Sequence, residues 1–379
     1  MAGLGSELSR LVDELNRSTR PVATGSEHIS IDRLLAQAVQ RGASDLLLVA
    51  GSAIALRVQG SLTAAAGKPL SPDELRALLL PLLTGSRGEE LETRKSLDFC
   101  FVRAQIGRFR ANFHYQRGTL AASIRLLPAQ IPSLDSLNLP ASLAQLSERR
   151  QGLVLLTGPT GCGKSSTLAA LLGLINARRR DHIITIEDPI EYEHVNHSSI
   201  VEQIEVGHDT PSFAEAVRAV LRQDPDVILV GEMRDADTMS AALTAAETGH
   251  LVLSSLHTND TSQTISRILD IFPTGRQSQI RQQLSLALLA IITQQLVPAA
   301  DGTVRYPAVE ILMATTAIRN LIRTGHDHQI RSHVSTGRAE GMMTMEQSLA
   351  ELVRAGRILR ETAFAHCFRP EELRRVLEG

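Results

Sequence analysis

The 379-residue chain has no tryptophan, only 3% aromatic residues and a formal net charge of −2. Scarce aromatics argue against the stacking platforms that single-stranded nucleic acids use. A net charge this close to zero is unlike the strongly positive charge of a typical DNA-binding domain. Both observations lead us to expect no nucleic acid among the partners, although a local basic channel could still serve a nucleic-acid motor.

Cysteines are few, and they are widely separated. Cys100, Cys162 and Cys367 form no C-x-x-C pair, so neither a zinc site nor a disulfide framework follows from them. No apolar run approaches the ~18 residues of a spanning helix, and the N-terminus lacks the apolar core of a signal peptide. We therefore expect a cytoplasmic protein that a partner holds wherever it works at a membrane.

Lysine is rarer still, because the chain has only Lys68, Lys95 and Lys164. Lys164 falls in a G-x-x-x-x-G-K-S sequence, between the apolar run 153–156 and leucines at helical spacing from Leu168 onward. A loop of this kind turns backbone N–H groups around phosphate oxygens, and the helix that follows adds its positive dipole end. The predicted nucleotide-binding residues are Gly158, Pro159, Thr160, Gly161, Cys162, Gly163, Lys164, Ser165 and Ser166.

Two later strands are predicted to end on acidic residues. The run 183–186 ends on Glu187, and the fully apolar run 227–230 is followed by Gly231 and Glu232. In such a protein, Lys164 would reach the β- and γ-phosphates, while Ser165 and Glu232 would hold Mg²⁺. Either Glu187 or Glu232 would polarise the attacking water. No N-K-x-D motif is present, so ATP is favoured over GTP.

Histidines stand near both ends of another predicted strand, 250–257. A polar residue at the end of a strand beside the Glu232 strand can sense the γ-phosphate. His250 and His257 could equally be structural, and their spacing does not choose between the two interpretations.

Composition divides the chain into four parts. Residues 1–27 look like an extension with a short helical stripe and a linker, and residues 28–127 like an α+β domain with antiparallel strands. A proline-punctuated linker, 128–140, precedes a domain at 141–379 in which strands and helices alternate. That alternation predicts a parallel sheet with helices on both faces. Residues 280–291 are expected to form one amphipathic helix.

Three arginines mark the smaller domain. Arg108 and Arg110 are two residues apart on a predicted strand and share one face with each other, and Arg125 lies on the next strand. Guanidinium groups near one sheet edge could bind phosphate oxygens. From spacing alone, a solvated arginine face is the simpler interpretation.

Four motifs in a fixed order resemble those of the secretion and type IV pilus ATPases. The stretches 158–165, 186–191, 228–235 and 249–258 look like the Walker A motif, Asp box, Walker B motif and His box of that family. Within it, the chain is most similar to the pilus retraction ATPases. The sequences at 42–46, 108–110, 270–273 and 317–323 carry that closer likeness.

The resemblance implies a PAS-like N-terminal domain, a RecA-like ATPase domain and a homohexameric ring. It also implies ATP-driven pilus disassembly and twitching motility at the cytoplasmic face of the inner membrane. The implied partners are the pilus platform protein and, as a second candidate, the pilus extension ATPase. Family members use arginines of the N-terminal domain on the nucleotide, which implies a catalytic role for Arg108, Arg110 and Arg125. The full set of predicted catalytic residues adds those from the motifs, namely Lys164, Glu187, Glu232, His250 and His257.

Some positions depart from the retraction pattern. Leu47 stands where the family usually has histidine, and Gln295 stands where arginine is common, which removes a cation expected near the site. The stretch 256–260 looks more like the extension and type II secretion ATPases. Those activities are therefore the alternative function, ahead of a RecA-like nucleic-acid motor and a nucleotide-binding regulator that does not hydrolyse.

Overall fold

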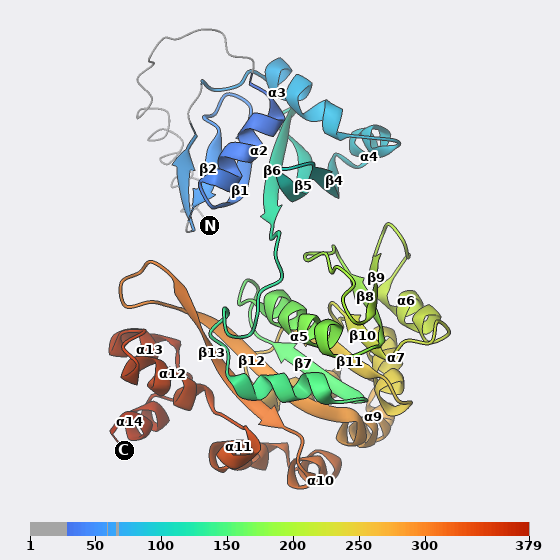
Figure 1. Ribbon diagram of the computed structural model, residues 1–379, viewed down its shortest axis with the longest axis vertical. Coiled ribbons are helices and arrows are strands. Elements are labelled where there is room, and N and C mark those ends of the chain that lie inside the picture. The colour runs from blue at the N-terminus through green and yellow to red at the C-terminus, as the bar shows by residue number, and fades with distance from the viewer. Residues whose placement is uncertain (1–28, 59, 66–67, 379) are drawn as a thin grey trace. The chain divides into compact units, whose positions relative to one another are not determined.

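The computed structural model describes residues 29–58, 60–65 and 68–378, and the helical stripe expected within residues 1–27 lies outside them. The chain divides into two compact units between Ala129 and Gln130 (Figure 1). No described helix is long and apolar enough to cross a membrane.

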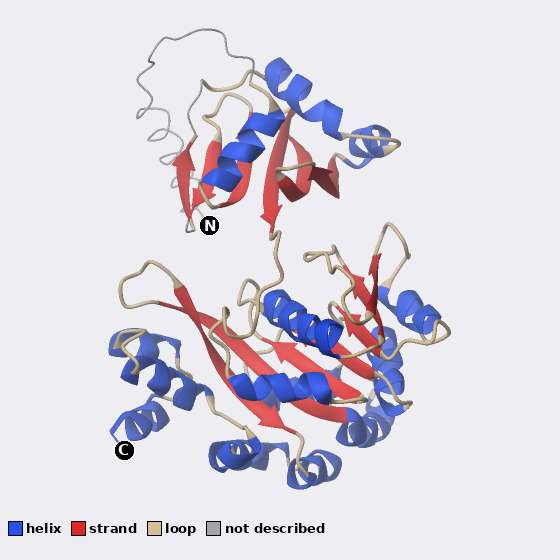
Figure 2. Cartoon of the chain, viewed as in Figure 1, coloured by secondary structure: helices blue, strands red, loops and turns tan. Residues whose placement is uncertain are grey.

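The first unit is a six-stranded antiparallel sheet in the order β3-β2-β1-β6-β5-β4, with helices on one face (Figure 2). Its helices and strands are α2 (Ile31–Gln40), β1 (Ala43–Val49), β2 (Ala55–Val58), β3 (Ser61–Ala64), α3 (Pro72–Leu79), η1 (Leu80–Leu82), α4 (Arg87–Arg94), β4 (Ser96–Arg103), β5 (Gly107–Gln116) and β6 (Thr119–Leu127).

Alternation along β5 explains the two faces of this sheet. Phe109, Ala111 and Phe113 are fully buried in the core that also contains residues of α2, α3 and α4. Arg108 and Arg110 occupy the intervening positions and therefore point to the opposite face. The predicted mixed domain with antiparallel strands is thus observed, and its helices cover only the apolar face.

The second unit is built on a seven-stranded sheet in the order β13-β12-β7-β11-β10-β8-β9. Its strands are β7 (Gly152–Thr157), β8 (His182–Glu187), β9 (Ile200–Glu205), β10 (Val227–Val230), β11 (Leu251–Leu256), β12 (Leu288–Pro298) and β13 (Arg305–Met313). Its helices are η2 (Ala141–Glu148), α5 (Lys164–Arg178), α6 (Phe213–Val220), α7 (Ala236–Glu247), α8 (Thr261–Asp270), α9 (Thr274–Ala287), α10 (Thr316–Thr324), η3 (Asp327–Gln329), α11 (Ile330–Thr336), η4 (Arg338–Glu340), α12 (Met345–Arg354), α13 (Arg360–His366) and α14 (Pro370–Glu378).

The helix expected over residues 280–291 is wrong in its last four residues, because α9 ends at Ala287 and β12 begins at Leu288. A short apolar run has the same composition in a buried strand and in a buried helix, so periodicity could not separate the two. The added strand also corrects the sheet. It is parallel from β12 to β9, but β13 pairs antiparallel with β12 at one edge.

Both faces of this sheet are covered, which explains the uninterrupted apolar run of β7. Leu153 and Leu155 pack in a core shared with α6, α7 and α9, whereas Val154 and Leu156 pack in another shared with α5 and η2. Since β7, β8, β10 and β11 are parallel, their carboxyl ends meet at one edge of the sheet. That edge holds the candidate site.

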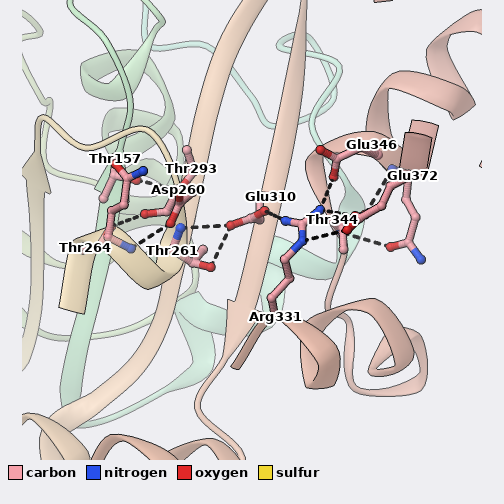
Figure 3. Close-up of polar contacts among 12 residues, drawn as sticks. Thr157, Asp260, Thr261, Thr264, Thr293, Glu310, Arg331, Thr344, Glu346 and Glu372 are labelled. Atoms are coloured by element: carbon pink, nitrogen blue, oxygen red, sulfur yellow. Dashed lines mark hydrogen bonds and ion pairs between the residues drawn. The ribbon is translucent and has the colours of Figure 1, made fainter. Parts of the chain in front are cut away.

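A polar network of Thr261, Glu310, Arg331, Glu346 and Glu372 runs from the start of α8 to the C-terminal helices (Figure 3). The backbone N–H and hydroxyl of Thr261 donate to Glu310 Oε1 at 2.9 and 2.7 Å. Arg331 donates to the other oxygen of Glu310 at 3.3 Å, to Glu346 at 2.6 Å and to Glu372. The network fastens α11, α12 and α14 to β13.

Candidate functional site: a nucleotide loop at the carboxyl edge of the sheet

The glycine-rich loop lies between β7 and α5, as the motif predicted. Gly158 and Gly163 have φ values of +136° and +91°, a region that side chains disfavour. A Cβ on Gly158 would overlap the carbonyl oxygen of Gln294, and one on Gly163 would lie 2.9 Å from Gln294 Nε2. Glycine is therefore required here both for the turn and for the close approach of β12.

Lys164, the first residue of α5, is 9% exposed. Its ammonium group donates hydrogen bonds to the carbonyls of Gly158 at 2.8 Å and Pro159 at 3.1 Å. Burial lowers the pKa of Lys164, while the charges of Cys162, Glu232 and Glu191 oppose the shift. The loop thus holds a cation at its centre, where phosphate oxygens of a nucleotide would bind.

His257 and Glu232 complete this cluster from the ends of the two neighbouring strands. His257 Nδ1 lies 3.5 Å from the Lys164 ammonium, and its Nε2 lies 3.7 Å from Glu232 Oε2. Burial and the charge of Lys164 lower the pKa of His257, although Glu232 raises it. A neutral ring with its proton on Nε2 fits both contacts. Glu232 also pairs with Arg234 at 2.8 Å.

His250 does not join this cluster. It precedes β11, and six residues of extended strand, about 20 Å, separate it from His257. Its Nδ1 lies 2.9 Å from the carbonyl of Ala245, in the last turn of α7. The structure thus places the two histidines at opposite ends of β11, and a catalytic role for His250 stays a prediction.

Glu187 ends β8, next to the strand that precedes Glu232. Burial raises the pKa of Glu187, and hydrogen bonds from Thr185, Gln203 and the backbone N–H of Glu191 act in the opposite direction. The hydroxyl of Thr185 lies 2.7 Å from Glu187 Oε1. Glu187 and Glu232 therefore both remain candidates for polarising water.

Sequence reasoning missed Gln294, which binds the loop from β12. Its Nε2 donates to the carbonyl of Cys162 at 2.7 Å, and its Oε1 accepts from the hydroxyl of Thr167 at 2.8 Å. Gln295 points away from the loop and donates to the carbonyl of His366 at 2.9 Å. An arginine at position 295 would therefore also face away from the loop, since neighbouring residues of a strand face opposite sides.

This pair of glutamines offers a direct comparison. We expect Gln294→Ala to weaken nucleotide binding about tenfold, because the loop loses its support and a buried carbonyl loses its donor. Gln295→Ala should leave nucleotide affinity within about twofold. Titration with a fluorescent ATP analogue measures both affinities. Equal losses from the two substitutions would contradict the assignment of Gln294 to the loop.

The three predicted arginines share one face of the first unit. Arg110 and Arg125 are directly opposite each other on β5 and β6, and Arg108 is two residues from Arg110. Arg125 pairs with Asp45 at 3.0 Å, and Arg110 lies 3.9 Å from Asp98. Their action on nucleotide phosphates stays a prediction.

The fold and the loop together define a P-loop ATPase with a small α+β domain before the ATPase domain. A model of the type II/IV secretion system protein family matches residues 109–372, and the chain belongs to that family. It is 39% identical to the type IV pilus ATPase PilU of Pseudomonas aeruginosa, over 92% of each chain. It is also 42% identical to the type IV pilus retraction ATPase PilT of the same organism, over 88% of this chain and 97% of PilT.

A crystal structure of the pilus retraction motor PilT with bound ADP agrees over 92% of this chain and 99% of that one. Its sequence is 46% identical and the TM-score is 0.86. The predicted resemblance to the pilus retraction ATPases and the predicted fold class are thereby confirmed.

Proposed function

We propose that this protein is a type IV pilus retraction motor, in which ATP hydrolysis drives pilus disassembly and twitching motility. The observation that carries the proposal is the meeting of Lys164, His257 and Glu232 at the loop, in a chain similar along nearly its whole length to retraction ATPases. That likeness covers the small domain as well as the ATPase domain.

The oxygen donors near the loop suit a magnesium nucleotide. Ser165 follows Lys164 on α5, and Glu232 supplies a carboxylate beside the same ammonium, so the donor set consists of the hard oxygen ligands that Mg²⁺ prefers. Bound Mg²⁺ would neutralise charge on the phosphates. Lys164 and the N–H groups at the start of α5 would bind those phosphates, and Glu187 or Glu232 would orient the attacking water.

A motor of this kind needs an assembly around it. We propose a homohexamer at the cytoplasmic face of the inner membrane, where the ring engages the pilus platform protein and, as a second candidate partner, the extension ATPase. Arg108, Arg110 and Arg125 would contribute positive charge to the γ-phosphate. No nucleic acid takes part. These assignments rest on the resemblance to pilus retraction ATPases.

The stretch 256–260 had favoured extension or type II secretion, and the structure gives one of its residues a local role. Asp260 caps α8, because its carboxylate accepts the backbone N–H of Gln263 at 2.7 Å. An aspartate with this function stabilises a helix end whichever way the motor works. The departure at Asp260 is therefore weak support for the alternative.

Complementation tests the direction of the motor. We expect this chain to restore twitching motility in cells that lack their own retraction ATPase, and the Lys164→Ala variant to fail at equal expression. Failure of the parent chain with ATP hydrolysis intact in the purified protein would favour an extension or secretion ATPase. Failure together with absent hydrolysis would favour a nucleotide-binding regulator.

A further inference from the structure

Gln203 lies on β9 and uses its whole side-chain amide around Glu187. Its Nε2 donates to Glu187 Oε1 at 3.2 Å and to the carbonyl of Tyr192 at 2.8 Å. Its Oε1 accepts the backbone N–H of His194 at 2.8 Å. Because a carboxylate only accepts, the nitrogen end of the amide must face Glu187, and the bond from His194 fixes the same orientation independently.

Thr185 holds the same oxygen of Glu187 from the other side. It is fully buried two residues before Glu187, on the same face of β8, and its hydroxyl donates to Oε1 at 2.7 Å. Thr185 is also the residue directly opposite Gln203 in the parallel pairing of β8 with β9. Two donors on adjacent strands thus converge on one carboxylate oxygen, which removes much of the rotational freedom of a glutamate side chain.

The segment that Gln203 fastens also contacts the helix of the nucleotide loop. The buried hydroxyl of Tyr192 and the hydroxyl of Ser166 on α5 share a hydrogen bond of 2.7 Å. Gln203 therefore binds Glu187 through one N–H and, through the other, a segment attached to α5. Hydrogen bonds thus connect the Glu187 carboxylate, through Gln203 and the segment at Tyr192, to the helix that begins at Lys164.

We propose that Gln203 and Thr185 are positioning residues for ATP hydrolysis, holding the Glu187 carboxylate in the orientation in which it polarises the attacking water. The inference rests on the proposed function, in which Glu187 is one of two candidates for that role. Gln203 and Thr185 act through Glu187 rather than on the nucleotide. Their loss should therefore slow the chemical step and leave nucleotide binding unchanged.

Steady-state kinetics of the full-length protein test this role. Gln203→Leu and Thr185→Val should each lower kcat about 10- to 100-fold, since a displacement of ~1 Å in a reacting group costs up to about 100-fold. The KM for ATP should stay within about twofold. Thr185→Ser keeps the hydroxyl and should retain most of the kcat. Gln203→Glu preserves the shape of the side chain but sets a carboxylate oxygen against Glu187, so it should be at least as slow as Gln203→Leu.

A matched control lies on the same strand. Glu202 is exposed beside Gln203 and pairs with His182 at 3.2 Å, so Glu202→Gln should keep the parental kcat. A KM for ATP that rises as much as kcat falls in Gln203→Leu and Thr185→Val would overturn the positioning role. So would equal losses from Glu202→Gln and Gln203→Leu.

A double-mutant cycle with Glu187→Gln separates this inference from the function beneath it. We expect Glu187→Gln alone to reduce kcat strongly, and Gln203→Leu to add little in that background. Full kcat in Glu187→Gln would reject Glu187 as the group that acts on water, and the inference with it. If kcat falls in Glu187→Gln but stays at the parental value in Gln203→Leu and Thr185→Val, the positioning role alone is overturned. Fully additive losses would identify Gln203 as merely structural.

Discussion

The Lys164→Ala variant should lose ATP hydrolysis by about 100- to 1000-fold, the range seen when a group that stabilises developing charge is removed. Lys164 is the buried cation of the loop, and its ammonium bonds to the loop's own carbonyls. A nucleotide phosphate would draw these hydrogen bonds to itself, and alanine can supply neither the charge nor the donors. Release of inorganic phosphate at saturating ATP measures the loss.

Another of the chain's three lysines, Lys68, provides a matched control. Lys68 is 72% exposed and pairs with Glu74 at 2.8 Å in the first unit. Lys68→Ala removes the same side chain from the surface and should keep the parental rate. Retained hydrolysis in Lys164→Ala would refute the assignment of the loop, whereas losses in both variants would indicate a general effect on folding.

The Arg331→Met variant should destabilise the second unit by about 3–5 kcal/mol. Arg331 pairs with Glu310, Glu346 and Glu372, and the first two are only 4% and 1% exposed (Figure 3). Burial opposes the charge of Arg331, but hydrogen bonds to Glu372 and Glu346 raise its pKa. Methionine has a similar length and no charge, so it leaves two buried carboxylates without their cation.

Thermal unfolding of the full chain measures this loss, and we expect the second unit's transition to fall by about 10 °C. Arg338→Met is the control, because Arg338 pairs with Glu351 at 2.6 Å on the surface with 70% of its side chain exposed. An exposed pair of this kind contributes at most about 1 kcal/mol. Similar melting temperatures for the two variants would show that the network does not hold the C-terminal helices.

The structure gives the surroundings of Gln295 and Leu47, two residues that depart from the family pattern. Gln295 binds the carbonyl of His366 at the C-terminal helices, so its substitution for arginine concerns their attachment to β12 rather than charge at the nucleotide. Leu47 lies on β1 opposite Ser123 of β6, on the face of the sheet that also carries Asp45. Within the second unit, the departure at Gln295 removes no group from the cluster at Lys164.

The sequence alone determined the nucleotide loop and the strand ends around it. Its signals are local: the glycines and Lys164 occupy fixed positions in a strand-loop-helix segment, and Glu187 and Glu232 follow apolar runs. Alternation at Arg108 and Arg110 likewise assigned both to one face of a strand. Such features depend on a few consecutive residues, so periodicity and turn chemistry are enough to predict them.

Only the tertiary structure decided which distant residues support that loop. Gln294 comes from β12, whose first four residues the sequence had assigned to a helix, and Gln203 lies on β9, which no pattern had indicated. The sequence had placed His250 and His257 near opposite ends of one strand, but only the structure shows that His257 lies beside Lys164 and Glu232. Strand order and register join residues far apart in the chain, and packing of the whole sheet sets both, so no local pattern encodes them.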